Sequence, residues 1–190
     1  MLLLVGLGNP GSTYTNTRHN IGFKIIDAIN AQFKLSKQKP KFKGLLTTGN
    51  IEEKKIYAIK PLTFMNNSGI CIRELIDYFK IDAKNVFVFH DDMDIDFGKI
   101  KAKFGGSSAG HNGIESIDKF IGKDYSRVRI GIGHPKQKKK VNNHVLEDFK
   151  EDEEEKINEI AENIVKQLPT LIEKKIDLFS SKVNQDLNGI

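Results

Sequence analysis

Continuous apolar runs alternate along the chain with segments in which apolar residues recur at helical spacing. Met1–Val5 and Val86–His90 are continuous apolar runs, which predicts two buried strands. Apolar residues three and four positions apart predict a helix over roughly His19–Phe33. We expect two further helices, over Gly69–Phe79 and Asn112–Phe120. Loops rich in Gly, Asn, Pro and Ser separate these segments.

Four more segments are typical of strands. Lys41–Ile51 and Lys54–Lys60 predict a hairpin, Lys99–Phe104 alternates charged and apolar residues, and Arg127–Gly133 is a further strand. Strands that alternate with helices predict the α/β class, and the hairpin adds antiparallel pairing. We therefore expect a mixed, mostly parallel twisted sheet with helices on both faces.

The C-terminal part of the chain is expected to be helical. An acidic run, Glu147–Glu155, precedes apolar residues at helical spacing, and it predicts a solvated helix start that complements the helix dipole. Pro169 is expected to break or kink this helical segment, 151–180, and in the tail, 181–190, the residues Val183–Ile190 are expected to be frayed. No repeat or linker divides the chain, so we expect one domain over 1–190.

Composition narrows the choice of compartment and partner. The 190 residues carry a formal net charge of +5, which permits a polyanionic partner without requiring one. The lone cysteine, Cys71, cannot form an intramolecular disulfide, and it is predicted to be buried filler in a helix. The apolar start lacks a charged n-region and is too short for a signal peptide or a membrane span. We therefore expect a cytoplasmic protein that is not bound to a membrane.

A glycine motif near the start suggests dinucleotide binding, but its context does not fit. The segment from Gly6 to Gly11 matches G-x-G-x-x-G after a strand. That fingerprint requires a helix to begin within the glycines, whereas this helix is predicted to begin near His19. Asp27 lies near the offset of the ribose-binding acid but inside the helical pattern. The glycines are better explained as shaping a loop at the carboxyl end of a strand.

Polar residues in four loops form a candidate hydrolytic site. An imidazole has a pKa near 6.5, so His19 suits a general base at neutral pH. Asp91 could bond one ring nitrogen and leave the other to take a proton from water. Asparagine side chains, such as Asn9 and Asn112, could donate to an oxyanion without adding charge. Three of the loops follow strands, which predicts that they converge at one edge of the sheet.

The acidic segment His90–Asp96 could also suggest a cation site. With Asp92 as the first position of an EF-hand, Phe97 and Lys103 would occupy the sixth and twelfth positions, where Gly and Glu are needed. The chain has no His-Glu-x-x-His motif and no cysteine pair. We therefore expect no metal and no other cofactor.

Basic residues alternate along two of the predicted strands. Alternation places the members of each set on one face of the sheet, where they could bind phosphates. A solvated strand face is the alternative. A separate basic run at 136–140 is expected to be an exposed loop. The alternating residues are Lys99, Lys101, Lys103, Arg127 and Arg129.

Five blocks stand in order along the chain: LVGLGNPGSTYTNTRHNIG, KPLTFMNNSG, HDDMDIDFGKIK, GHNGIESI and RVRIGIGHP. Together they resemble the bacterial peptidyl-tRNA hydrolase family. The resemblance runs from Met1 to about Phe149. It implies a monomeric, metal-free α/β enzyme that releases peptides from tRNA dropped by stalled ribosomes, by cutting the ester to the terminal ribose.

The resemblance also implies residue roles. His19 activates water, Asp91 holds that histidine in its basic form, and Asn9 helps to tell blocked peptidyl-tRNA from free aminoacyl-tRNA. Other positions match residues that bind the tRNA end and the peptide: Tyr14, Phe64, Asn66 and Asn112, with Met65 lining the same pocket. A third set matches the residues that grip acceptor-stem phosphates: Lys101, Lys103, His111 and Arg129.

The chain departs from the family pattern at two places. Ala109 stands where the family has a glycine, with Ser107 and Ser108 also replacing glycines, so we expect a slightly stiffer loop. His144 stands where an aromatic residue is common. Two other functions stay open: a non-catalytic RNA-binding module, which would not need His19 and Asp91 together, and a small-molecule hydrolase, whose activity would be insensitive to salt.

Overall fold

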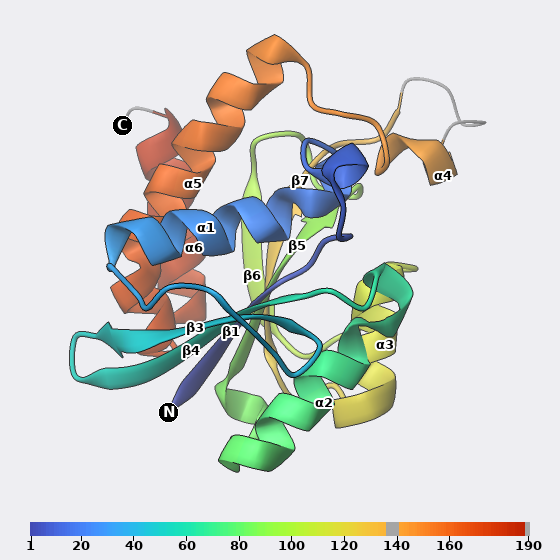
Figure 1. Cartoon of the computed structure of the whole chain (residues 1–190). Helices are drawn as coiled ribbons and strands as arrows, with labels where there is room; N and C mark the ends of the chain where they lie inside the picture. The colour runs from blue at the N-terminus through green and yellow to red at the C-terminus, as the bar shows by residue number, and fades with distance from the viewer. Residues whose placement is uncertain (136–140, 189–190) are drawn as a thin grey trace.

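The computed structural model describes residues 1–135 and 141–188, so the basic run at 136–140 lies outside the described residues. Within these described residues, seven strands form one mixed, twisted sheet in the order β2-β3-β4-β1-β5-β7-β6 (Figure 1). The central strands β4, β1, β5 and β7 are parallel, and the strands at both edges pair antiparallel, as predicted. The strands are β1 (Leu2–Gly6), β2 (Lys39–Lys41), β3 (Gly44–Ile51), β4 (Lys54–Pro61), β5 (Val86–Asp92), β6 (Ile100–Phe104) and β7 (Ser126–Gly131).

Helices cover both faces of this sheet, which confirms the predicted layers (Figure 1). Within β1, Leu2 and Leu4 pack toward α1, α5 and α6, while Leu3 and Val5 pack toward α2 and α3. Burial on both faces explains why this strand is a continuous apolar run rather than an alternating one. The helices are α1 (Ile21–Gln32), α2 (Ser68–Phe79), α3 (Asn112–Ile121), α4 (Val141–His144), α5 (Glu151–Ile172) and α6 (Ile176–Asn188).

Two glycines let α1 lie directly against the sheet. A Cβ atom on Gly6 would lie 2.1 Å from the carbonyl oxygen of Gly22, and one on Gly22 would lie 2.4 Å from the carbonyl oxygen of Phe89. Real Cβ atoms do not tolerate such distances, so the close approach requires glycine at both positions. This packing brings the residues before α1, including His19, next to the end of β5.

Two predictions about the C-terminal part are wrong. Pro169 lies inside α5, which continues to Ile172, because Leu168 and Leu171 on either side of the proline are fully buried in the core. The predicted fraying from Val183 is not found, since α6 extends to Asn188 and Val183 is buried. The chain turns between the two helices at 173–175.

The acidic start of α5 is largely solvated, as predicted, since Glu151, Asp152 and Glu155 are exposed, and two of its glutamates also form ion pairs. Glu153 accepts a hydrogen bond from Arg18 at 2.7 Å, and Glu154 pairs with Lys24 at 3.0 Å. These contacts link the start of α5 to the segment that carries His19. Among the described residues, no helix is long and apolar enough to cross a membrane.

Candidate active site

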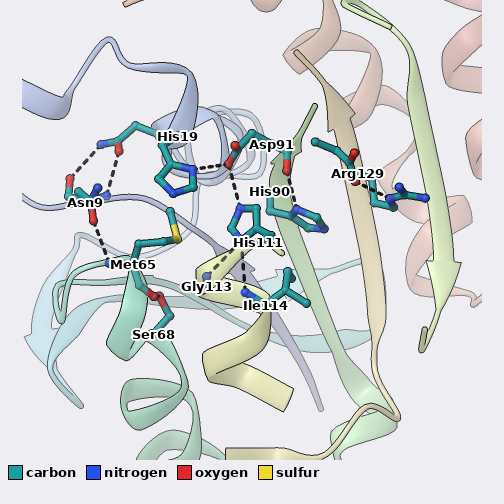
Figure 2. A network of polar contacts seen from close by, with 12 residues as sticks. Asn9, His19, Met65, Ser68, His90, Asp91, His111, Gly113, Ile114 and Arg129 are labelled. Atoms are coloured by element: carbon teal, nitrogen blue, oxygen red, sulfur yellow. Dashed lines mark hydrogen bonds and ion pairs between the residues drawn. The ribbon is translucent and has the colours of Figure 1, made fainter. Parts of the chain in front are cut away.

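Asp91 lies at the centre of a buried polar cluster (Figure 2). It lies within β5, one residue before the end of the strand, rather than in the following loop, and only 1% of its surface is exposed. One of its oxygens, Oδ1, bonds both Nδ1 of His19 at 2.8 Å and Nε2 of His111 at 3.0 Å. The predicted pairing of His19 with Asp91 is therefore present in the structure, with a second histidine on the same oxygen.

The contacts of His19 fix which of its nitrogens can act as a base. A carboxylate oxygen accepts, so Nδ1 carries the proton that bonds Asp91. Nε2 then holds the lone pair, and it has no hydrogen-bond partner among the described residues. His19 also lines a pocket of about 190 Å³, which gives that lone pair access to a substrate.

His111 is held as a neutral ring. Its Nδ1 accepts the backbone N–H groups of Gly113 at 3.1 Å and Ile114 at 3.3 Å, and it thereby caps the start of α3. A nitrogen that accepts cannot carry the proton, so Nε2 carries it and donates to Asp91.

Asp91 is held in its ionised form. Burial by itself would raise the pKa of this carboxyl group. The ring N–H groups of His19 and then His111 attract this carboxylate and donate hydrogen bonds to it, which outweighs burial and holds the pKa well below its usual range. A charged acceptor that stays charged at neutral pH suits the role of stabilising a histidine that gains a proton.

Two other buried groups next to the sheet carry no charge. Burial, with His111 nearby, holds the pKa of His90 well below its usual range, and its Nδ1 donates to the backbone carbonyl of Asp91 at 2.7 Å. Burial raises the pKa of the Cys71 thiol to about 12, so that thiol is not a nucleophile. The prediction that Cys71 is a buried filler agrees with this environment.

Asn9 is held in one orientation near His19. Its Oδ1 accepts the backbone N–H of Met65 at 2.8 Å. The side chain of Asn20 bonds both the N–H and the carbonyl of Asn9, each at 2.9 Å. Within the described part of the chain, Nδ2 of Asn9 has no partner and is available as a donor. The sequence did not identify Asn20 as the residue that fixes Asn9.

Other predicted binding residues are distributed around the same end of the sheet. Asn112 lines the same pocket as His19, together with residues 91–94 and the loop at 108–111. Tyr14 and Phe64 make an edge-to-face contact with ring centroids 6.4 Å apart, and Phe64 is 53% exposed. Asn66 is exposed. These residues could therefore contact a large substrate that extends beyond the pocket.

Met65 differs from this group because it is buried. A Cβ atom on Gly113 would lie 2.4 Å from its sulfur, so the thioether packs against the start of α3. The lining of the pocket beside His19 does not include Met65. Its role in the structure is to support the wall that also carries Asn112.

The basic residues divide into exposed and buried ones. Lys101 faces Arg129 across β6 and β7, and Arg129 pairs with Asp92 at 2.6 Å. Burial, followed by repulsion from Arg129 and Arg127, lowers the pKa of Lys103, which marks this face as electropositive. Arg127 is 1% exposed and pairs with Asp118, so it is a structural residue rather than a surface cation.

The polar cluster has the composition of a metal site, but its bonding does not suit one. Ligand atoms of His19, Asp91 and His111 lie within 4.8 Å of one another. A metal ligand must offer a lone pair, and Nε2 of His111 carries a proton because Nδ1 caps α3. Metal binding would therefore require His111 to give up its cap. The contacts favour a hydrogen-bonded cluster.

Comparison with known proteins agrees with this arrangement. A family model described as peptidyl-tRNA hydrolase matches residues 3–189. A peptidyl-tRNA hydrolase of Pelagibacter ubique is 73% identical over 97% of this chain and 99% of its own length, and one of Ehrlichia canis is 46% identical over 97% and 95%. The crystal structure of peptidyl-tRNA hydrolase from Acinetobacter baumannii has a TM-score of 0.90 at 34% identity, covering 97% of this chain and 94% of that one.

Proposed function

The chain belongs to the peptidyl-tRNA hydrolase family, and we propose that it hydrolyses the ester between peptide and terminal ribose with His19 as the general base. One observation supports this role of His19 above all others. Its Nδ1 is bonded to the buried carboxylate of Asp91, while its Nε2 holds a lone pair at the pocket. This is the arrangement that a base needs to take a proton from water.

The reaction then needs no covalent intermediate with the protein. Nε2 of His19 takes a proton from water as the water oxygen attacks the ester carbonyl, and Asp91 stabilises the imidazolium that results. The tetrahedral intermediate breaks its bond to the ribose oxygen, which takes the proton back from His19. The products are a tRNA with a free terminal hydroxyl and a peptide acid, which releases its proton to solvent and becomes a carboxylate.

An asparagine donor polarises the carbonyl and stabilises the oxyanion. Nδ2 of Asn9 is a fixed donor, because the amide oxygen is held by Met65. Asn112 lines the pocket and is the second candidate. Comparing the kcat of Asn9→Ala with that of Asn112→Ala distinguishes the two, and a loss below about threefold in both would exclude both, since one such donor is typically worth 10²–10³ in kcat.

Substrate binding extends from the pocket along the sheet. Tyr14, Phe64 and Asn66 contact the tRNA end and the peptide, and Lys101, Lys103 and Arg129 bind acceptor-stem phosphates. For His111 the contacts support another role than phosphate binding. A neutral ring with both nitrogens engaged is suited to hold Asp91 in place. We further propose a single domain that acts as a cytoplasmic monomer without a metal.

The test compares two esters in the presence of a chelator. The protein should cleave N-acetylaminoacyl-tRNA and leave free aminoacyl-tRNA intact. His19→Ala should remove this cleavage without lowering the Tm by more than a few degrees. Salt-sensitive tRNA binding by a folded protein that cleaves neither ester would contradict the proposal, and loss of activity on chelation would contradict its metal-free form.

A further inference from the structure

Strand β6 lies at the edge of the sheet, and helix α6 binds its outer side (Figure 1). The side chain of Asn184 accepts the N–H of Ile100 at 2.9 Å and donates to the carbonyl of Ile100 at 2.8 Å. The hydroxyl of Ser180 accepts the N–H of Ala102 at 2.8 Å. These are backbone groups that an edge strand otherwise presents to solvent. Side chains of α6 thus take the place of a neighbouring strand.

The sequence of α6 provides two adjacent rows of side chains. Phe179, Val183 and Leu187 recur at four-residue spacing and are buried in the core. Ser180 and Asn184 follow the first two by one position, and so they form a polar row beside the apolar one. The apolar row fixes the helix on the sheet, and the polar row then meets the edge of β6.

The bonded residues of β6 flank the lysines that we assign to phosphate binding. Ile100 and Ala102 point into the core, and Lys101 between them points to the opposite face, as does Lys103. On its inner side β6 pairs with β7, where Lys101 faces Arg129. The backbone that carries Lys101 is therefore held on both sides, by β7 and by α6.

We propose that Asn184 and Ser180 are positioning residues for tRNA binding. By holding the outer edge of β6 they keep Lys101 and Lys103 beside the arginines of β7. Fixing these groups before tRNA arrives reduces the ordering that binding would otherwise require. This inference rests on the proposed phosphate-binding role of the two lysines, and it gives α6 a function beyond closing the core.

Asn184→Ala tests the inference through a split between KM and kcat. The N–H and carbonyl of Ile100 can bond water in this variant, so the fold should persist. We expect the KM for N-acetylaminoacyl-tRNA to rise about two- to tenfold with kcat unchanged. Hydrogen exchange at the Ile100 amide should accelerate. Asn184→Gln, which keeps both a donor and an acceptor, should recover part of the lost affinity.

Val183→Ala is the matched control on the same helix. It removes buried apolar contact next to Asn184 and should lower the Tm, yet leave the KM unchanged because the edge bonds remain. An equal rise in KM in Val183→Ala, or an unchanged KM in Asn184→Ala, would overturn the inference. Lys101→Ala tests the phosphate-binding proposal separately from the positioning role of Asn184. If it too leaves the KM unchanged, the phosphate-binding proposal itself is wrong.

Discussion

The buried cluster around Asp91 and the basic face around Lys101 use charge in opposite surroundings. Asp91 is 1% exposed, and His19 and His111 bind it from two directions. Lys101 is exposed, and the phosphates that it would bind are themselves in water. Salt screens exposed charges but reaches buried ones far less. The chemical step and the binding step should therefore respond to different changes, the first in kcat and the second in KM.

Removing the charge of Asp91 should have the largest effect. Asp91→Asn keeps the shape of the side chain but cannot stabilise a charged His19. We expect kcat to fall by roughly 10²–10⁴ with KM changed less than about threefold, since this is the range for losing support of a general base. Single-turnover cleavage of N-acetylaminoacyl-tRNA measures this. A kcat loss below tenfold in a folded variant would remove Asp91 from the mechanism.

Substitutions on the basic face should have the second largest effect, and they should change only the binding of tRNA. Lys101→Ala and Lys103→Ala should each raise the KM and reduce the slope of log affinity against log salt by about one, because each lysine releases counterions from a phosphate. The kcat should not change in either. Lys123→Ala, an exposed lysine at the end of α3, is the control. Equal slopes in all three variants would show that the face does not bind tRNA.

A third prediction concerns pH and the neutral His90 behind Asp91. Its folded pKa is lowered by burial, so below about pH 6.5 the unfolded chain gains a proton that the folded chain does not. Stability should therefore fall with falling pH, by at most about 1.4 kcal/mol per pH unit from this group. His90→Gln should flatten this dependence.

Urea unfolding at pH 7.5 and 5.5 measures the change in His90→Gln. The matched control is His134→Gln, because His134 is an exposed histidine near the same end of the sheet. The prediction is wrong if His90→Gln keeps the full difference in unfolding free energy between the two pH values.

The smallest effect is expected at Ala109, in the loop that lies between the two regions. Its φ of 49° is in the left-handed region, where an alanine is strained by about 1 kcal/mol. Ala109→Gly removes this strain but adds backbone freedom to the unfolded chain, so we expect a change within about 1 kcal/mol in the stabilising direction. The same substitution in helix α1, Ala31→Gly, should destabilise the protein by a similar amount. A loss of stability in Ala109→Gly would contradict this account.

Much of the fold and the central pair of the site could be predicted from the sequence. Apolar runs and helical spacing predicted the main strands and helices. Because three of the polar loops follow strands, the residues that they carry were expected to converge at one edge of the sheet, where His19 and Asp91 do meet. The four-residue spacing of Phe179, Val183 and Leu187 is a sequence signal for α6, but the proline at 169 favoured the prediction of a helix break. The burial of Leu168 and Leu171 on either side of Pro169 outweighs the low helix propensity of the proline.

Other features depend on contacts that no local pattern contains. The neutral state of His111 follows from two N–H groups of α3 and one oxygen of β5. Arg127 alternates with Arg129 in the sequence, and each pairs with an aspartate, but 1% of the Arg127 side chain is exposed against 19% of the Arg129 side chain. Contacts between different helices and strands determine the protonation of His111 and the burial of Arg127.

The segment around His19 is joined to a part of the chain that is made much later. The N–H of His19 bonds the carbonyl of Val145, and the guanidinium of Arg18 bonds the carbonyls of Glu147 and Asp148, 129 and 130 residues further on. During synthesis the first twenty residues leave the ribosome long before these partners exist. While the protein is being made it is itself a peptide esterified to tRNA. The histidine that we propose as the base for cutting such esters is fixed in place only when most of the chain has emerged.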